Sequence, residues 1–382
     1  MDNETLEELL SAVRRFVDRR LVPLEAQVDN DDEVPADVVD EMRTLGLFGL
    51  TIPEEYGGLG LTMVEEVRVA MELGRTSPAF RSVFGTNVGI GSQGIVIDGT
   101  DAQKQAWLPR MARGEVIASF CLTEADAGSD AAPLRTRAHR RDDHYVLEGT
   151  KRYITNAPRA GAFTVMARTA DTERPADGIT AFIVDAATPG IRLGRPEKKM
   201  GQRGAHICDV VFDGCEVPAD AVIGGVEGRG FRTAMKVIDR GRLSIAAVCV
   251  GSASRLVQEM RRYALERRQF GRPIAEFQLV QAMLADSETE RRAAQALVLE
   301  AARKRDAGAR VTQDAAMAKY FASEMVGRVA DRAVQLFGGA GYVADYGIER
   351  FYRDVRLFRI YEGTSQIQQL VIARELLAGD AG

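Results

Sequence analysis

The sequence predicts an α+β protein with an N-terminal α-helical domain over residues 1–116, a middle antiparallel β domain over 117–226 and a C-terminal four-helix bundle over 227–382. In the first and last thirds, apolar residues recur at the three- and four-residue spacing of a buried helical face. The middle third alternates short apolar stretches with turn residues, which is typical of strands. The length of 382 residues is also typical of two or three folding units.

The first third begins with an amphipathic helix that Pro23 interrupts. Its buried face is predicted to hold Leu6, Leu9, Leu10, Val13 and Val17. A loop rich in Gly and Pro follows at 51–60. Further helices are predicted at 36–50, 63–77, 85–99 and 101–115.

The middle third contains apolar stretches whose lengths suit the strands of a compact β domain. They lie at 116–124, 144–156, 162–170, 178–187, 190–194 and 207–217. No long helical period separates them, so the pattern disfavours a parallel sheet with crossover helices.

The pattern of the last third predicts long helices with short connections, which favours an antiparallel bundle. The four predicted helices lie at 235–268, 277–305, 312–337 and 366–377. The segment 239–247, DRGRLSIAA, is expected at the opening of the first of them.

Composition excludes several classes of function. The net charge of −5 and pI near 5.6 disfavour a nucleic-acid partner. The 4 cysteines form no Cys-x-x-Cys pair, so we expect no disulfide framework and no metal site. All 3 histidines lie in the middle third, which gives a Ser-His-Asp site little support. With no signal peptide and no apolar run long enough for a membrane span, we expect a cytoplasmic protein.

The one dinucleotide-like glycine pattern is Gly339, Gly341 and Ala344. A nicotinamide-binding fingerprint must follow a strand and open a helix, but this pattern follows a predicted helix. We therefore expect a glycine-rich turn between two helices.

Three polar stretches are candidates for ligand contacts, each with an ordinary structural alternative. The loop of 119–130 carries Thr123 and Ser129, which could bond a ligand or simply line a strand exit. The stretch 152–156 could stack on a planar cofactor or be a routine strand. Arg242 could meet a phosphate or carbonyl, or pair at the surface with Asp239.

Glu362 is the candidate base. Ser365 and Gln368 have the spacing of a capping box, which predicts that a helix begins at Ser365 and leaves Glu362 outside it. Partial burial would raise the pKa of such a carboxylate into a useful range for a general base. From this segment alone, an acid near the positive end of a helix is the favoured interpretation.

Six motifs, taken together, favour Glu362 as a catalytic base over an ordinary acid near a helix end. They are SFCLTEADAGSD (119–130), RYITN (152–156), DRGRLSIAA (239–247), YALERRQFG (263–271), QLFGGAGYVADYGIERFYRD (335–354) and IYEGTSQIQ (360–368). In this order and spacing the chain resembles the acyl-CoA dehydrogenases over essentially its whole length, in the short- and medium-chain type with a C-terminal glutamate base.

The resemblance implies FAD as cofactor and an acyl-CoA thioester as substrate. The implied reaction is α,β-dehydrogenation to a trans-2-enoyl-CoA, with FAD as hydride acceptor and an electron-transferring flavoprotein as reoxidant. It further implies fatty acid β-oxidation within lipid metabolism, and a homotetramer built as a dimer of dimers.

The resemblance also assigns catalytic and binding roles to individual residues. Glu362 corresponds to the catalytic base, which would remove the α-proton. The cofactor-binding positions would be Phe120, Leu122, Thr123, Ser129, Tyr153, Thr155, Arg267, Gln269, Phe270, Gln278, Gln335, Gly338, Gly339, Thr364 and Gln366. Those of them in the 267–270 and 335–339 stretches would bind the ADP part of FAD across a subunit boundary. The substrate-binding positions would be Ser129, Asp239, Arg242 and Gly363.

Two departures from the family pattern matter. Tyr153 stands where many relatives have tryptophan, which keeps a stacking face of smaller area. Some relatives carry the base on the helix near Arg242, but Gly241 occupies that position here and cannot serve. Glu362 is therefore the only base that the resemblance leaves.

Other functions on the same scaffold remain as alternatives: an acyl-CoA oxidase, a flavin monooxygenase, or a non-catalytic homologue. The intact YEGTS motif argues against monooxygenation, which needs no α-proton base. Neither acyl chain length nor branching follows from the sequence. Gly89, Gly91 and Gly94 fall where the resemblance expects the pocket floor, and they could leave room for a longer chain or serve close packing.

Overall fold

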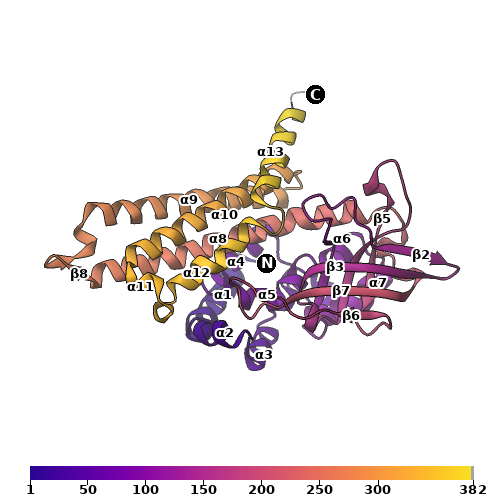
Figure 1. Ribbon diagram of the computed structural model, residues 1–382, viewed down its shortest axis with the longest axis horizontal. Coiled ribbons are helices and arrows are strands. Elements are labelled where there is room, and N and C mark those ends of the chain that lie inside the picture. The colour runs from indigo at the N-terminus through magenta and orange to yellow at the C-terminus, as the bar shows by residue number, and fades with distance from the viewer. Residues whose placement is uncertain (380–382) are drawn as a thin grey trace.

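The computed structural model describes residues 1–379, in which helices are followed by a sheet and then by long helices. Figure 1 shows the long helices extending to one side of the molecule and the sheet lying at the other, with the N-terminal helices beside them. This order confirms the predicted fold class.

The N-terminal part consists of short helices. They are α1 (Asn3–Phe16), α2 (Glu25–Asp31), α3 (Ala36–Thr44), α4 (Met63–Leu73), α5 (Pro78–Val88), α6 (Gln93–Asp98) and α7 (Asp101–Ala112). The single helix predicted over 85–99 is wrong, because the chain breaks between α5 and α6. Gly91 lies in that break, where an added Cβ would come within 2.8 Å of Ala118, so the close approach to the sheet requires glycine.

The middle part is a single seven-stranded sheet. Its strands are β1 (Ala118–Cys121), β2 (Arg137–Arg141), β3 (His144–Thr155), β4 (Ala162–Arg168), β5 (Ile179–Asp185), β6 (Ile191–Leu193) and β7 (Ile207–Pro218). The predicted antiparallel pairing holds for most of the sheet, but β1 runs parallel to β4. The chain reaches β4 only after the hairpin of β2 and β3, so it returns in the direction of β1 without a crossover helix. The sequence pattern also missed β2, because only Ala138 of that strand is buried.

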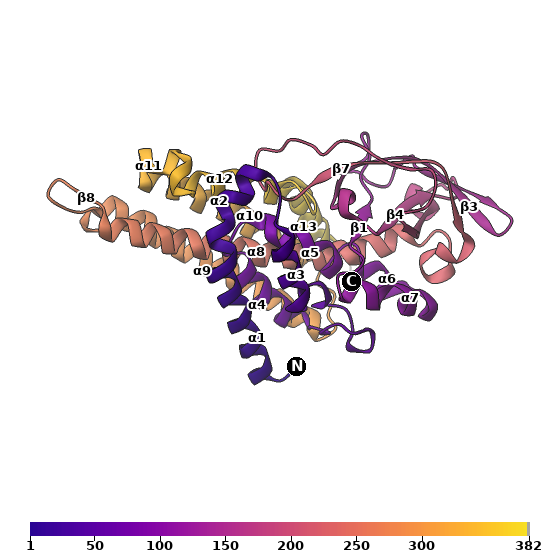
Figure 2. The same ribbon diagram turned by 90° about the horizontal axis from the view of Figure 1, so that it is seen from below.

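The C-terminal part is dominated by helices that pack along one another. They are α8 (Gly230–Glu266), α9 (Gln278–Asp306), α10 (Thr312–Phe337), α11 (Gly339–Tyr342), α12 (Ile348–Val355) and α13 (Ser365–Gly379), and the small hairpin of β8 (Arg268–Gln269) and β9 (Arg272–Pro273) joins α8 to α9. Figure 2, seen from below, places this hairpin far from the sheet. Helix α8 has 37 residues and is about 55 Å long.

Helix α8 begins earlier than predicted, which changes the setting of one candidate. Asp239 and Arg242 lie in the helix interior rather than at its opening, since the helix starts at Gly230. The side chains around them are buried against α4, α9 and α10. Within residues 1–379 no helix is both long and apolar enough to cross a membrane.

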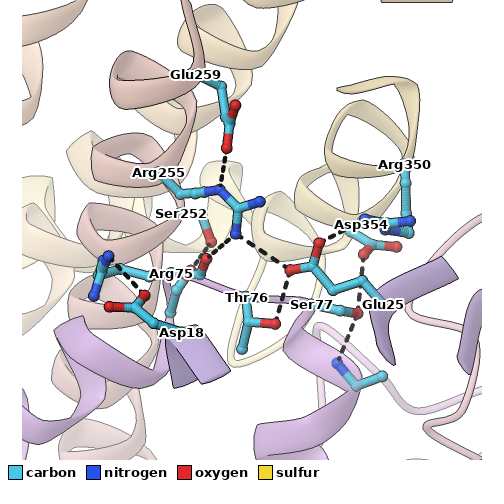
Figure 3. A network of polar contacts seen from close by, with 12 residues as sticks. Asp18, Glu25, Arg75, Thr76, Ser77, Ser252, Arg255, Glu259, Arg350 and Asp354 are labelled. Carbon is cyan, nitrogen blue, oxygen red and sulfur yellow. Dashed lines mark hydrogen bonds and ion pairs between the residues drawn. The ribbon is translucent and has the colours of Figure 1, made fainter. Parts of the chain in front are cut away.

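A buried polar network holds the N-terminal helices against the bundle (Figure 3). Arg350 and Thr76 both donate to the Glu25 carboxylate, at 2.7 and 2.8 Å. Arg255 of α8 donates to the Arg75 carbonyl at 3.2 Å and lies 3.6 Å from the same Glu25 carboxylate. Because α5 begins just after Thr76, the network fixes where α5 lies relative to α8.

Candidate active site

Glu362 lies in a short loop between the turn of Arg356–Arg359 and α13, and its backbone is left-handed. Its φ is 54° and that of Gly363 is 86°. Gln368 Nε2 donates to the Glu362 and Gly363 carbonyls at 2.9 and 3.0 Å, and Lys319 Nζ donates to the Gly363 carbonyl at 2.7 Å. A left-handed backbone at a glutamate costs conformational energy. The three hydrogen bonds offset that cost and hold the loop in one conformation.

The predicted capping box is wrong, although α13 does begin at Ser365. The Ile367 N–H donates at 3.2 Å to the Thr364 hydroxyl, which therefore caps the helix. The Ser365 hydroxyl instead donates to Glu324 at 2.6 Å. Gln368 is engaged with the loop carbonyls, so the residues of the predicted box hold the loop rather than the helix end.

The Glu362 carboxylate turns inward against α8. A Cβ added to Gly241 would come 2.7 Å from Oε2, so only glycine leaves the carboxylate its place. Desolvation in this position raises the pKa of Glu362 above its ordinary value of 4.5, although Arg81, Arg242 and Lys319 each act to lower it. Glu362 is half-buried, and a carboxylate whose pKa is raised by desolvation has the property that a general base needs.

Arg242 is paired with Asp239 at 2.7 Å, as the structural alternative predicted, but the pair is not at the surface. Arg242 is buried, and Asp239 also accepts a bond of 2.9 Å from the Thr312 hydroxyl. The Nε of Arg242 is buried without a partner in residues 1–379. Arg242 therefore has a guanidinium N–H without a partner, and its charge acts on Glu362.

The predicted residues of the middle domain gather where β1 and β3 end. The Arg152 N–H donates to the Thr123 carbonyl at 2.8 Å, and the Ser119 hydroxyl donates to the Thr155 carbonyl at 2.7 Å. Tyr153 has a φ of 59° and is 53% exposed beside the loop, and the Arg152 guanidinium lies over its ring, 5.0 Å from the ring centroid. Phe120 and Thr123 are half-buried, Leu122 is buried and Ser129 is exposed, all in or after β1.

Helix α5 joins this region to the Glu362 loop. Asn156, one residue after β3, donates to the Ser82 carbonyl at 2.7 Å and to the Thr86 hydroxyl at 2.9 Å. From the same helix, Arg81 donates to the Ser244 hydroxyl of α8 at 2.8 Å. The structure therefore brings the sheet residues and Glu362 to the two sides of α5.

Another predicted set lies elsewhere, at the far end of the bundle, and all of its members are exposed. It consists of Arg267, Gln269, Phe270, Gln278, Gln335, Gly338 and Gly339. Phe270 is 93% exposed and has a φ of 50°. The opposite end of α8 packs on β5, so most of the length of α8 separates this set from the sheet residues (Figure 1). Thr364 and Gln366 lie with Glu362 instead.

Sequence reasoning missed Arg81 and Lys319, which both face Glu362. It also missed Lys151, which is 0% exposed and donates to Glu124 at 2.8 Å beneath the loop of Thr123. Arg81 and Lys319 are each a single charge within an otherwise apolar or small-residue stretch, and that isolation is the signal that could have found them; Lys151 stands beside Arg152 and has no such signal.

Family models match nearly the whole chain in three parts. The models are described as the N-terminal, middle and C-terminal domains of acyl-CoA dehydrogenase, and they match residues 3–115, 119–215 and 228–377.

Individual relatives match over the same extent. The chain is 41% identical to the 3-(aryl)acrylate reductase of Clostridium sporogenes, covering 98% of this chain and 99% of that protein. A solved butyryl-CoA dehydrogenase from Megasphaera elsdenii is 35% identical with a TM-score of 0.94, covering 99% of this chain and 100% of that one. A chain from a structural study of the electron transferring flavoprotein of Acidaminococcus fermentans is 37% identical, also with a TM-score of 0.94, covering 99% and 100%.

Proposed function

The chain belongs to the acyl-CoA dehydrogenase family, whose members are oxidoreductases acting on acyl-CoA, and we propose that it catalyses α,β-dehydrogenation of an acyl-CoA thioester to the trans-2-enoyl-CoA. The observation that carries the proposal is the half-buried Glu362, whose carboxylate packs against Gly241 and whose pKa is raised by desolvation. A partly desolvated carboxylate on a fixed loop can take a proton from carbon when the resulting negative charge is stabilised nearby.

Glu362 acts in this proposal as the base that removes the α-proton. A thioester α-C–H is a weak acid, so the developing negative charge on the thioester oxygen needs fixed donors. The backbone N–H of Glu362 is the donor that the family pattern assigns. The bonds from Lys319 and Gln368 hold the Glu362–Gly363 backbone, and they therefore aim this N–H and the carboxylate together.

FAD fits the residues present, in two separate places. The exposed ring of Tyr153, with Thr155 and Thr123 nearby, suits a flat ring with polar edges. At the bundle end, Arg267 and Gln269 offer donors, and no atom lies within 4 Å of where a Cβ on Gly338 or Gly339 would be. When bound, FAD supplies the acceptor for the β-hydride.

The separation of the two places supports a cofactor site shared between subunits. The length of α8 keeps the sheet residues and the bundle-end residues apart within one chain. Apolar side chains at this end of the bundle are exposed, including Phe270, Leu279 and Tyr342, as expected of a surface that another subunit covers. We include a homotetramer in the proposal on this ground.

Shared sites predict complementation between two inactive variants. Tyr153→Asp damages the sheet half and Arg267→Glu the bundle half, so each homo-oligomer is expected to lose FAD. In a mixed oligomer some sites combine two undamaged halves and others two damaged halves. FAD content and turnover of the co-expressed pair should therefore recover in part. Mixed oligomers that bind no more FAD than either variant alone would contradict the shared site.

The raised pKa of Glu362 predicts an acid limb in the pH dependence of kcat/KM. Activity needs the ionised carboxylate, so it should fall as the pH drops through a pKa above 4.5. Lys319 acts to lower that pKa, so Lys319→Met should move the limb to higher pH. Lys319→Arg keeps the charge and serves as the matched control. An unmoved limb in the Met variant would show that Lys319 does not act on the base electrostatically.

The electron acceptor and the compartment are also part of the proposal. The similarity to a chain from the study of the Acidaminococcus fermentans electron transferring flavoprotein supports such a flavoprotein as reoxidant. We further propose a role in fatty acid β-oxidation in the cytoplasm. The relative named 3-(aryl)acrylate reductase favours testing the reverse reaction as well, because the same base that removes a proton can return it.

The deciding experiment is anaerobic addition of acyl-CoA to the purified, FAD-loaded protein. Bleaching of the flavin absorbance, followed by slow reoxidation in air, is the expected result. Fast reoxidation in air would instead indicate an acyl-CoA oxidase. A colourless protein that cannot be reconstituted with FAD would overturn the proposed function and indicate a non-catalytic homologue.

A further inference from the structure

The loop that carries Glu362 is held at both ends by one residue of α10. Residues 360–364, called the base loop below, lie between Arg359 and Ser365. The Ser365 hydroxyl donates to Glu324 Oε1 at 2.6 Å, and Arg359 Nε forms an ion pair with Glu324 Oε2 at 3.2 Å. The Arg359 Nε–H makes no hydrogen bond within residues 1–379, so this second contact is electrostatic. The two oxygens of one carboxylate therefore hold the two ends of the base loop.

The place of Arg359 depends on a glycine in the same part of α10. A Cβ added to Gly327 would overlap the Arg359 guanidinium, so only glycine leaves that side chain its position. Glycine in the interior of a helix costs conformational entropy, which calls for a reason in packing. Gly327 lies three residues after Glu324, and residues at this spacing share a helix face. This face of α10 is thus shaped to receive the residue that precedes the base loop.

Fixed ends matter because the middle of the base loop is strained. Glu362 and Gly363 are both left-handed, and a left-handed glutamate persists only where its surroundings hold it. The bonds from Lys319 and Gln368 hold the carbonyls in the middle of the loop. They do not act on the ends, which Glu324 holds. A loop fixed at its ends and in its middle keeps one conformation, in which the carboxylate packs against α8.

We propose that Glu324 is a positioning residue for the base, which closes the base loop so that Glu362 is aimed at the substrate. This inference rests on the proposed function and adds a residue to it. Glu324 acts only through Arg359 and Ser365, and it takes no part in the bond changes. The α-C–H bond breaks with its proton passing to Glu362, and the β-hydrogen leaves with its electron pair to FAD.

The test measures kcat and KM, per bound FAD, with an acyl-CoA and an artificial electron acceptor. Glu324→Ala releases both ends and should lower kcat by about 100-fold, the cost of misplacing a reacting group by about 1 Å. KM should change little, because the loss falls on the transition state. Ser365→Ala and Arg359→Met each release one end and should each lower kcat by about 2- to 10-fold. Glu324→Gln keeps an acceptor for the Ser365 hydroxyl and should retain part of the activity.

The pH dependence of kcat/KM separates positioning from a loss of stability. A released loop exposes the Glu362 carboxylate to water and weakens the desolvation that raises its pKa, so the acid limb should move to lower pH. The charge of Glu324 also acts on Lys319, so Glu324→Ala combines two effects. Ser365→Ala changes no charge, and a shift of its acid limb therefore reports the loop alone.

Glu290→Ala is the matched control. Glu290 of α9 also bridges two side chains, Arg328 and Arg332 of α10, each at 2.8 Å, but neither of them flanks the base loop. This variant should keep both kcat and the acid limb of the natural protein. A loss of kcat equal to that of Glu324→Ala would contradict the inference, because any ion pair of α10 would then have the same effect.

Near-native kcat of Glu324→Ala, with its acid limb unmoved, would overturn the inference while the proposed function stands. If Glu324→Ala does not fold, Ser365→Ala decides, because it removes one hydroxyl: near-native kcat and an unmoved limb again overturn the inference. Flavin of the natural protein that no acyl-CoA bleaches would overturn the proposed function itself.

Discussion

Replacing Glu362 with glutamine is expected to lower turnover by about 10²–10⁴-fold, the usual contribution of a general base. Glutamine keeps the shape of the side chain and the space against Gly241, but its amide cannot accept the α-proton. The left-handed backbone should survive, because the bonds from Lys319 and Gln368 go to carbonyls that the substitution leaves in place. The measurement is turnover with an artificial electron acceptor.

Two further readouts make the Glu362 experiment specific. Exchange of the substrate α-hydrogen with deuterated water should stop in Glu362→Gln, whereas FAD content should stay unchanged. Glu300→Gln is the control, because Glu300 is an exposed glutamate of α9. Near-native turnover of Glu362→Gln with a full complement of FAD would show that another group is the base.

Replacing Lys151 with methionine is expected to lower the free energy of unfolding by about 3–5 kcal/mol, because it leaves a buried carboxylate without its cation. Lys151 Nζ donates to Glu124 at 2.8 Å and to the Leu122 carbonyl at 3.2 Å. Glu124 further accepts the Arg135 and Thr136 N–H groups at 2.6 and 2.9 Å. The pair thus ties the loop after β1 to β3, and FAD content should fall along with stability.

Denaturant unfolding of the FAD-free protein measures this loss, so that a change in cofactor binding does not enter the result. The matched control is the double variant Lys151→Met with Glu124→Gln. Its second change removes the stranded charge, so the double variant should be more stable than Lys151→Met alone. A Lys151→Met protein as stable as the natural one would mean that the ion pair contributes nothing beyond its own desolvation cost.

Local patterns were sufficient for most of the fold. The helical periods of the first and last thirds and the short apolar stretches between them predicted the order of the three parts. The errors arose where contacts with distant residues decided the outcome. The predicted helix at 85–99 is interrupted where Gly91 packs closely against Ala118, and β2 is a strand because β3 pairs with it despite its charged sequence.

Part of the candidate site could likewise be predicted from local sequence, and part of it could not. The family resemblance and the choice of Glu362 as base came from the amino-acid sequence alone, because residue types at fixed spacing within short motifs carry that information. The packing of the Glu362 carboxylate against Gly241, the nearby charges of Arg81 and Lys319, and the distance of the bundle-end residues from the sheet became visible only in the folded chain. The physical reason is that desolvation and the influence of a charge depend on distances in space between segments far apart in the chain.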